Sequence, residues 1–103
     1  MKTIKKVPVR IEFVEEMPFD TIRENVLYVN KKTCRMRHNC LCGCDGLVDI
    51  PLSSINDNGE IHNGEPGQWH LTMKGDKATI TPSILNMPCN GHYIITNGIA
   101  NLV

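Results

Sequence analysis

Five side chains have types and spacing that are typical of a metal site. Cys40, Cys42 and Cys44 alternate along the chain, and Cys89 and His92 follow as a Cys-x-x-His pair. Thiolates and imidazoles are the ligands that zinc most often takes in structural sites. Simple packing of small buried side chains is the alternative, since cysteine is often buried, but it accounts poorly for this spacing. The pattern predicts one bound zinc ion that takes about four of the five candidates.

The backbone must turn sharply at the alternating cysteines. On a straight strand, residues two apart lie ~6.6–7 Å from each other, whereas two thiolates on one zinc ion lie within ~4 Å. Gly43 and Gly46 supply the freedom to bend there, and Gly91 supplies it between the later pair. Cys34 lies outside the spacing, so we expect it to be a packed or free thiol.

The number of ligands separates a structural site from a catalytic one. Four protein ligands close a zinc site, whereas three ligands and a water leave it able to catalyse hydrolysis. In the catalytic case, Glu15 is the candidate base, and His38 is the candidate for stabilising charge or moving a proton. Both also have ordinary explanations, as a strand-surface carboxylate and a packed or metal-supporting histidine. A cysteine nucleophile with a lowered pKa is a further variant.

Short apolar segments separated by turn residues predict a mostly β chain. We expect about seven or eight short antiparallel strands and little helix. Residues 7–14 alternate apolar and polar side chains, as a half-buried strand does, and Pro8 favours an edge position. Asn97-Gly98 lies between two apolar segments, which is the strongest short-range hairpin signal.

Other segments are defined by their turn residues. Gly75 suits a hairpin between residues 69–73 and 78–81. Residues 53–67 are rich in Ser, Asn, Asp and Gly, which predicts a long loop or a hairpin. Residues 20–25 follow a proline and predict one short helical turn, with Asp20 as its N-cap.

Composition and charge narrow the function further. The chain has 103 residues, which fits a single zinc-binding β domain over residues 1–103. Eleven basic and eleven acidic residues give a net charge of zero, which does not favour a nucleic-acid or membrane-surface partner. We see no signal peptide and no apolar run of about 20 residues. The prediction is a cytoplasmic protein with reduced thiols, and the odd count of five cysteines agrees.

The motifs together resemble a family of small bacterial and phage proteins, the domain of unknown function 6527. The matching stretches, in order, are Glu12-Phe13-Val14-Glu15, Pro18, Val26-Leu27-Tyr28-Val29, His38-Asn39-Cys40-Leu41-Cys42-Gly43-Cys44 with Gly46, Ile50-Pro51-Leu52, Trp69-His70-Leu71, Thr81-Pro82-Ser83-Ile84 and Pro88-Cys89-Asn90-Gly91-His92-Tyr93. Two departures occur. Asp45 separates the third cysteine from Gly46, and Gly91 stands where the family often has serine.

The resemblance implies a metal-binding β domain connected with ubiquitin-like conjugation. Members of the family are often encoded beside ubiquitin-like proteins and their activating and conjugating enzymes, which are therefore the expected partners. Two functions follow as alternatives. One is a metal-dependent peptidase or isopeptidase that processes ubiquitin-like proteins. The other is a noncatalytic module with structural zinc that serves a conjugation complex as an accessory protein.

Overall fold

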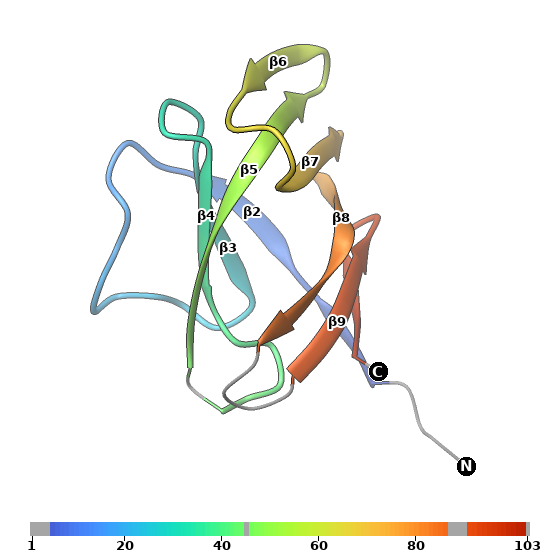
Figure 1. Ribbon diagram of the computed structural model, residues 1–103. Helices are drawn as coiled ribbons and strands as arrows, with labels where there is room; N and C mark the ends of the chain where they lie inside the picture. The colour runs from blue at the N-terminus through green and yellow to red at the C-terminus, as the bar shows by residue number, and fades with distance from the viewer. Residues whose placement is uncertain (1–4, 45, 87–90, 103) are drawn as a thin grey trace.

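The computed structural model describes residues 5–44, 46–86 and 91–102, and these residues form ten strands and no helix (Figure 1). The strands are β1 (Lys5–Pro8), β2 (Arg10–Phe13), β3 (Val26–Asn30), β4 (Arg35–Asn39), β5 (Leu47–Asp57), β6 (Glu60–Asn63), β7 (Trp69–Lys74), β8 (Lys77–Asn86), β9 (Gly91–Thr96) and β10 (Ile99–Leu102). The mostly β prediction is confirmed. Within the described part of the chain, no helix is long and apolar enough to cross a membrane.

The strands form one curled sheet that nearly closes on itself. Their order is β1-β10-β9-β8-β7-β5-β4-β3-β2, with β6 paired to the far part of β5. Strands β1 and β2 are separated in the chain by the single residue Val9, yet they lie at opposite ends of this strand order. Most pairs are antiparallel, whereas β2 runs parallel to β3 and β5 runs parallel to β7.

The concave side of the sheet encloses the apolar core. Alternation along each strand turns every second side chain inward, as Ile80, Ile84, Tyr93 and Ile95 show with exposures of 2% or less. Strand β3 is buried along its whole length. The core is therefore continuous from β3 to β9, and the outward residues of β7, β8 and β9 form a separate, solvent-facing surface.

The turn residues behave as their chemistry requires. Asn97 and Gly98 both have positive φ, 52° and 80°, so the predicted hairpin between β9 and β10 is confirmed. Asn58 and Gly59 do the same within residues 53–67, which form the β5–β6 hairpin and its return. The prediction of a helical turn at residues 20–25 was wrong, because the structure has no helix there. There, the backbone N–H and Nε of Arg23 donate to the Tyr28 hydroxyl, which holds the segment in an irregular path.

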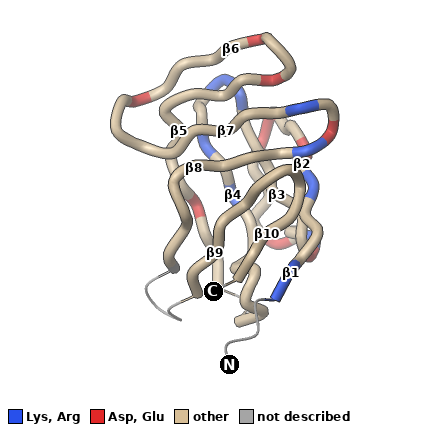
Figure 2. Tube along the Cα trace, turned by 90° about the vertical axis from the view of Figure 1, so that its right-hand side faces the viewer, with Lys and Arg blue, Asp and Glu red and all other residues tan. Residues whose placement is uncertain are grey.

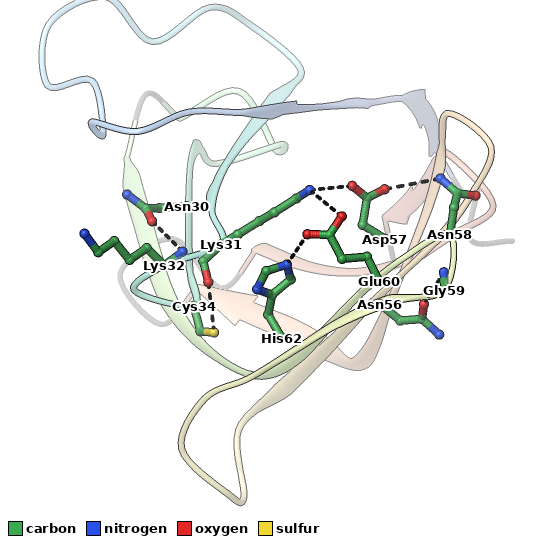
Figure 3. A network of polar contacts seen from close by, with 10 residues as sticks. All are labelled: Asn30, Lys31, Lys32, Cys34, Asn56, Asp57, Asn58, Gly59, Glu60 and His62. Atoms are coloured by element: carbon green, nitrogen blue, oxygen red, sulfur yellow. Dashed lines mark hydrogen bonds and ion pairs between the residues drawn. The ribbon is translucent and has the colours of Figure 1, made fainter.

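Ionic contacts fix the β5–β6 hairpin to the turn before β4 (Figure 3). Lys31 Nζ lies 2.6 Å from an Asp57 carboxylate oxygen and 3.9 Å from one of Glu60. His62 Nε2 lies 2.8 Å from the other oxygen of Glu60. His62 is thus engaged on the hairpin, and it is not part of the cysteine cluster described below.

Candidate active site and cysteine cluster

The alternating cysteines lie in the turn that follows β4. Strand β4 ends at Asn39, and the Cys40 N–H donates to the Gly46 carbonyl at 2.7 Å. Gly43 takes a φ of 89° and donates its N–H to the Cys40 carbonyl at 3.2 Å. The bend that the sequence predicts at these residues is therefore present, and the turn supplies the close approach that a straight strand cannot.

This turn brings three sulfur atoms together. The Sγ atoms of Cys40, Cys42 and Cys44 all lie within 4.8 Å of one another, and those of Cys40 and Cys42 are 3.4 Å apart. Thiolates on one tetrahedral zinc ion are ~3.8 Å apart, so the cluster fits a metal ion after small side-chain adjustments. Burial decreases along the cluster, from buried Cys40 to exposed Cys44. The three cysteines can therefore bind a metal ion.

His38 is a buried neighbour of this cluster. Its side chain has no exposed surface, and its Nε2 lies 2.6 Å from the Tyr93 hydroxyl. Burial lowers the pKa of His38 to about 4, so its ring is neutral at pH 7. Burial also raises the pKa of Tyr93, with a further contribution from the nearby Cys40 thiol. The neutral His38–Tyr93 pair thus connects β4 and β9 beside the cysteines.

The structure does not bring Glu15 to the cysteines. The Glu15 carbonyl accepts a hydrogen bond from Asn30 Nδ2 at 2.9 Å, and Asn30 pairs with Arg35 at the start of β4. Strand β4 runs from Arg35 to Asn39, about 13 Å at ~3.3 Å per residue, and Cys40 follows its far end. Glu15 instead lines a hollow of about 480 Å³ together with Phe13, Asn30, Lys31 and neighbouring residues.

His92 contacts a serine and not the described cysteines. Its Nε2 lies 2.9 Å from the Ser83 hydroxyl, and both side chains are partly exposed. Among the described residues, only Cys40, Cys42 and Cys44 form a group with ligand atoms within 4.8 Å of one another. The other predicted ligand of that pair, Cys89, lies outside the described residues. His92 as a metal ligand therefore stays a prediction.

An irregularity in β8 places Ser83 beside His92. Ile80 pairs with Ile95 and Ile84 pairs with Tyr93, so three residues, 81–83, lie opposite the single residue Ile94. Extra residues of this kind bend a strand and redirect its side chains, and they occur often beside active sites. Ser83 consequently reaches His92 diagonally across the outer face, while Ile84 and Tyr93 remain in the core.

Trp69 supports the serine from the neighbouring strand. Its indole Nε1–H donates to the Ser83 carbonyl at 3.2 Å, and its ring packs against the apolar core. The bond joins β7 to the irregular segment of β8, whose ladder to β9 is interrupted at this point. Trp69 thereby fixes the backbone that carries the Ser83 hydroxyl.

A second serine–histidine contact occurs on the same outer face. Ser54 Oγ lies 2.8 Å from His70 Nδ1, across the parallel pair β5–β7. Ser54 contacts the Nδ1 atom of His70, whereas Ser83 contacts the Nε2 atom of His92. In serine hydrolases Nε2 is the nitrogen that accepts the proton of the serine. The β5–β7 register shifts between Leu52 and Ser54, so this contact also lies beside an irregularity.

The sequence prediction did not identify Ser83 as a functional residue. Serine is common, and the contact spans nine positions between strands whose register the sequence does not give. The available signal was the Thr81-Pro82-Ser83-Ile84 stretch, because a proline inside a strand indicates an edge or an irregularity.

One protein family matches most of the chain. A family model described as bacterial ubiquitination-like system serine protease (BubE) matches residues 13–103. No curated protein and no solved structure matches the chain. The match supports the connection with ubiquitin-like conjugation that the resemblance implied, under a different family name. The chain, with its Ser83–His92 contact on the outer face of β8 and β9, belongs to the BubE family of bacterial ubiquitination-like systems.

Proposed function

We propose that the protein is a serine peptidase or isopeptidase that acts on ubiquitin-like proteins, with Ser83 as nucleophile and His92 as general base. The observation that carries the proposal is the 2.9 Å contact between Ser83 Oγ and His92 Nε2. A nucleophile and a base within hydrogen-bond reach are the minimum for serine hydrolysis. The description of the family as a serine protease supports the same chemistry.

The reaction follows from that contact. Ser83 Oγ attacks the carbonyl carbon of the scissile bond while its proton passes to His92 Nε2. The bond from that carbon to the leaving nitrogen then breaks, and the nitrogen takes the proton from His92. A water next attacks the ester on Ser83, giving one proton to His92, and the released Ser83 oxygen takes that proton back. The products are a carboxylate and an amine.

A metal ion at the cysteine turn would then have a structural role. We propose zinc, held by Cys40, Cys42 and Cys44, with Cys89 as the candidate fourth ligand. A thiolate-rich site favours zinc over ions that prefer oxygen ligands, and four thiolates leave no open position for a reacting water. A bound ion would stabilise this turn, which lies beside Tyr93.

The metal-dependent peptidase predicted from the sequence receives less support. Its candidate base, Glu15, lies at the end of β3 and β4 that is remote from the cysteines. Its other candidate, His38, is buried against Tyr93 and faces the core. Neither side chain is placed to act on a water bound at the cysteine turn.

Cysteines without disulfide bonds fit a cytoplasmic setting. The proposed partners of the protein, ubiquitin-like proteins and their conjugating enzymes, would be found there.

The test is cleavage of a purified ubiquitin-like precursor protein, followed by mass spectrometry. We expect Ser83→Ala to lower the cleavage rate by about a thousandfold or more, as removal of a serine nucleophile does. Ser54→Ala is the matched control, since it removes the other hydroxyl that contacts a histidine on the same face. A fluorophosphonate should label wild type and Ser54→Ala, but not Ser83→Ala.

The opposite pattern would reassign the chemistry. Cleavage retained in Ser83→Ala and lost in Ser54→Ala would make Ser54 and His70 the active pair. Cleavage retained in both variants but abolished by a chelator would favour the metal-dependent peptidase.

A further inference from the structure

Two exposed apolar side chains flank the Ser83–His92 contact. Leu85 is directly opposite His92 in the β8–β9 ladder, and Ile94 is opposite the irregular segment that carries Ser83. Leu85 is 51% exposed and Ile94 is 41% exposed. Their strand neighbours Ile84, Tyr93 and Ile95 are buried, so Leu85 and Ile94 point to the outer face.

The four residues form a compact square on that face. Ser83 and His92 occupy one diagonal, joined by their hydrogen bond, and Leu85 and Ile94 occupy the other. Residues two apart on one strand are separated by ~6.6–7 Å, and alternate side chains of an extended peptide have the same spacing. A peptide whose scissile carbonyl reaches Ser83 can therefore place neighbouring side chains against Leu85, along β8, and against Ile94, across on β9.

The strands that carry the square, and the adjacent β10, contain almost no charged residues. Strands β9 and β10 contain no Lys, Arg, Asp or Glu, and β8 has only Lys77, at its far end. Figure 2 shows charged positions at the upper end of this face and on β1 at its lower right. Lys6 of β1 pairs with Asn101, which in turn pairs with Ile94, so this charge lies two strands away from the square. Burying a charged side chain against such a surface has a desolvation cost with no compensating ion pair. The face thus favours an uncharged substrate segment.

From this arrangement we propose that Leu85 and Ile94 determine specificity, by receiving apolar side chains on the two sides of the scissile bond. The occupant is the extended segment of the substrate that is cleaved. The inference rests on the proposed serine peptidase activity and adds the class of bond: one between residues with uncharged, apolar side chains. Contact between apolar side chains stabilises the bound segment in proportion to the area removed from water.

The experiment uses quenched fluorescent peptides that carry Leu, Ala, Glu or Lys on either side of one scissile bond. For wild type we expect kcat/KM for Leu to exceed that for Glu by about tenfold or more. Leu85→Ser and Ile94→Ser should each lower kcat/KM for the Leu peptides by about tenfold, with Ser83 still labelled by fluorophosphonate. Ile61→Ser is the matched control, because Ile61 is an exposed isoleucine on β6, outside the strands that carry the square.

The outcomes separate this inference from the proposed function. Wild type that cleaves all peptides equally, or variants that keep its preference, would overturn the role of Leu85 and Ile94 and leave the peptidase intact. Labelling of Ser83 without cleavage of any Leu peptide would overturn the role as well. Absence of labelling and cleavage in wild type would remove the peptidase activity itself, and the inference with it.

Discussion

At the scale of single residues, Ser83 depends on its neighbours for its position. Its side chain contacts His92 and its carbonyl accepts the Trp69 N–H, so two strands hold the residue from different directions. The irregular segment of β8 lacks ladder partners on β9 at residues 81–83. The Trp69 bond therefore replaces part of the rigidity that a regular ladder would give the proposed nucleophile.

Trp69→Phe removes this donor while keeping an aromatic ring in the core. One neutral hydrogen bond contributes about 1 kcal/mol, so we expect kcat to fall about fivefold while KM changes little. Steady-state kinetics on the same peptide substrate would measure the two constants separately. An unchanged kcat would show that β8 holds Ser83 without the indole.

At the scale of elements, the return from β6 to β7 requires a glycine at residue 64. A Cβ there would lie 2.1 Å from the Leu52 carbonyl oxygen and 2.8 Å from the Cys34 Cβ. The Gly64 N–H also donates to the Ser53 carbonyl at 2.8 Å, which fixes the segment against β5. The backbone at Gly64 approaches the backbone at Leu52 so closely that a side chain on residue 64 has no space.

We expect Gly64→Ala to lower the free energy of unfolding by about 2–4 kcal/mol, because backbone and the buried Cys34 must both move. Gly67→Ala is the matched control. Gly67 has a φ of 84° but open space around its Cα, so the strain of a left-handed alanine alone, about 1 kcal/mol, should remain. Urea denaturation measures both values, and equal losses in the two variants would contradict the contact.

The elements also show how far the sequence could be interpreted. The hairpin at Asn97-Gly98 was predictable because its turn residues determine a local conformation. The cysteine turn was predictable because metal ligation restricts distances between sulfur atoms. The Ser83–His92 contact was not, since it depends on the register of β8 against β9 and on an irregularity that only tertiary packing fixes. The parallel pairing of β5 with β7 escaped prediction for the same reason.

At the scale of the whole molecule, the cysteine cluster and the proposed active-site face are parts of one strand assembly. Tyr93 faces inward beside Cys40, and the adjacent His92 faces outward beside Ser83. The cluster and the serine site therefore lie on opposite sides of β9. Stability supplied at the cysteine turn supports the strand that carries the proposed base.

We expect about one zinc ion per chain in protein purified without added metal. Cys40→Ser should lose the metal and several kcal/mol of stability, because metal binding contributes directly to the free energy of folding. Elemental analysis and thermal unfolding measure the two effects. Cys34→Ser is the matched control, since Cys34 is buried and reduced but lies outside the cluster. Equal metal content in Cys40→Ser and wild type would exclude this cluster as the metal site.

The division of the N-terminal segment between β1 and β2 has a consequence for local unfolding. Strand β1 pairs with β10, and β2, which follows one residue later, pairs with β3. The intervening residue, Val9, donates its N–H to the Gly98 carbonyl. If β1 and β2 detach together, the edges of β10 and β3 are exposed in a single event, at opposite ends of the sheet order. Amide hydrogens of β10 and β3, remote from each other in sheet order, would then exchange with solvent through the same opening.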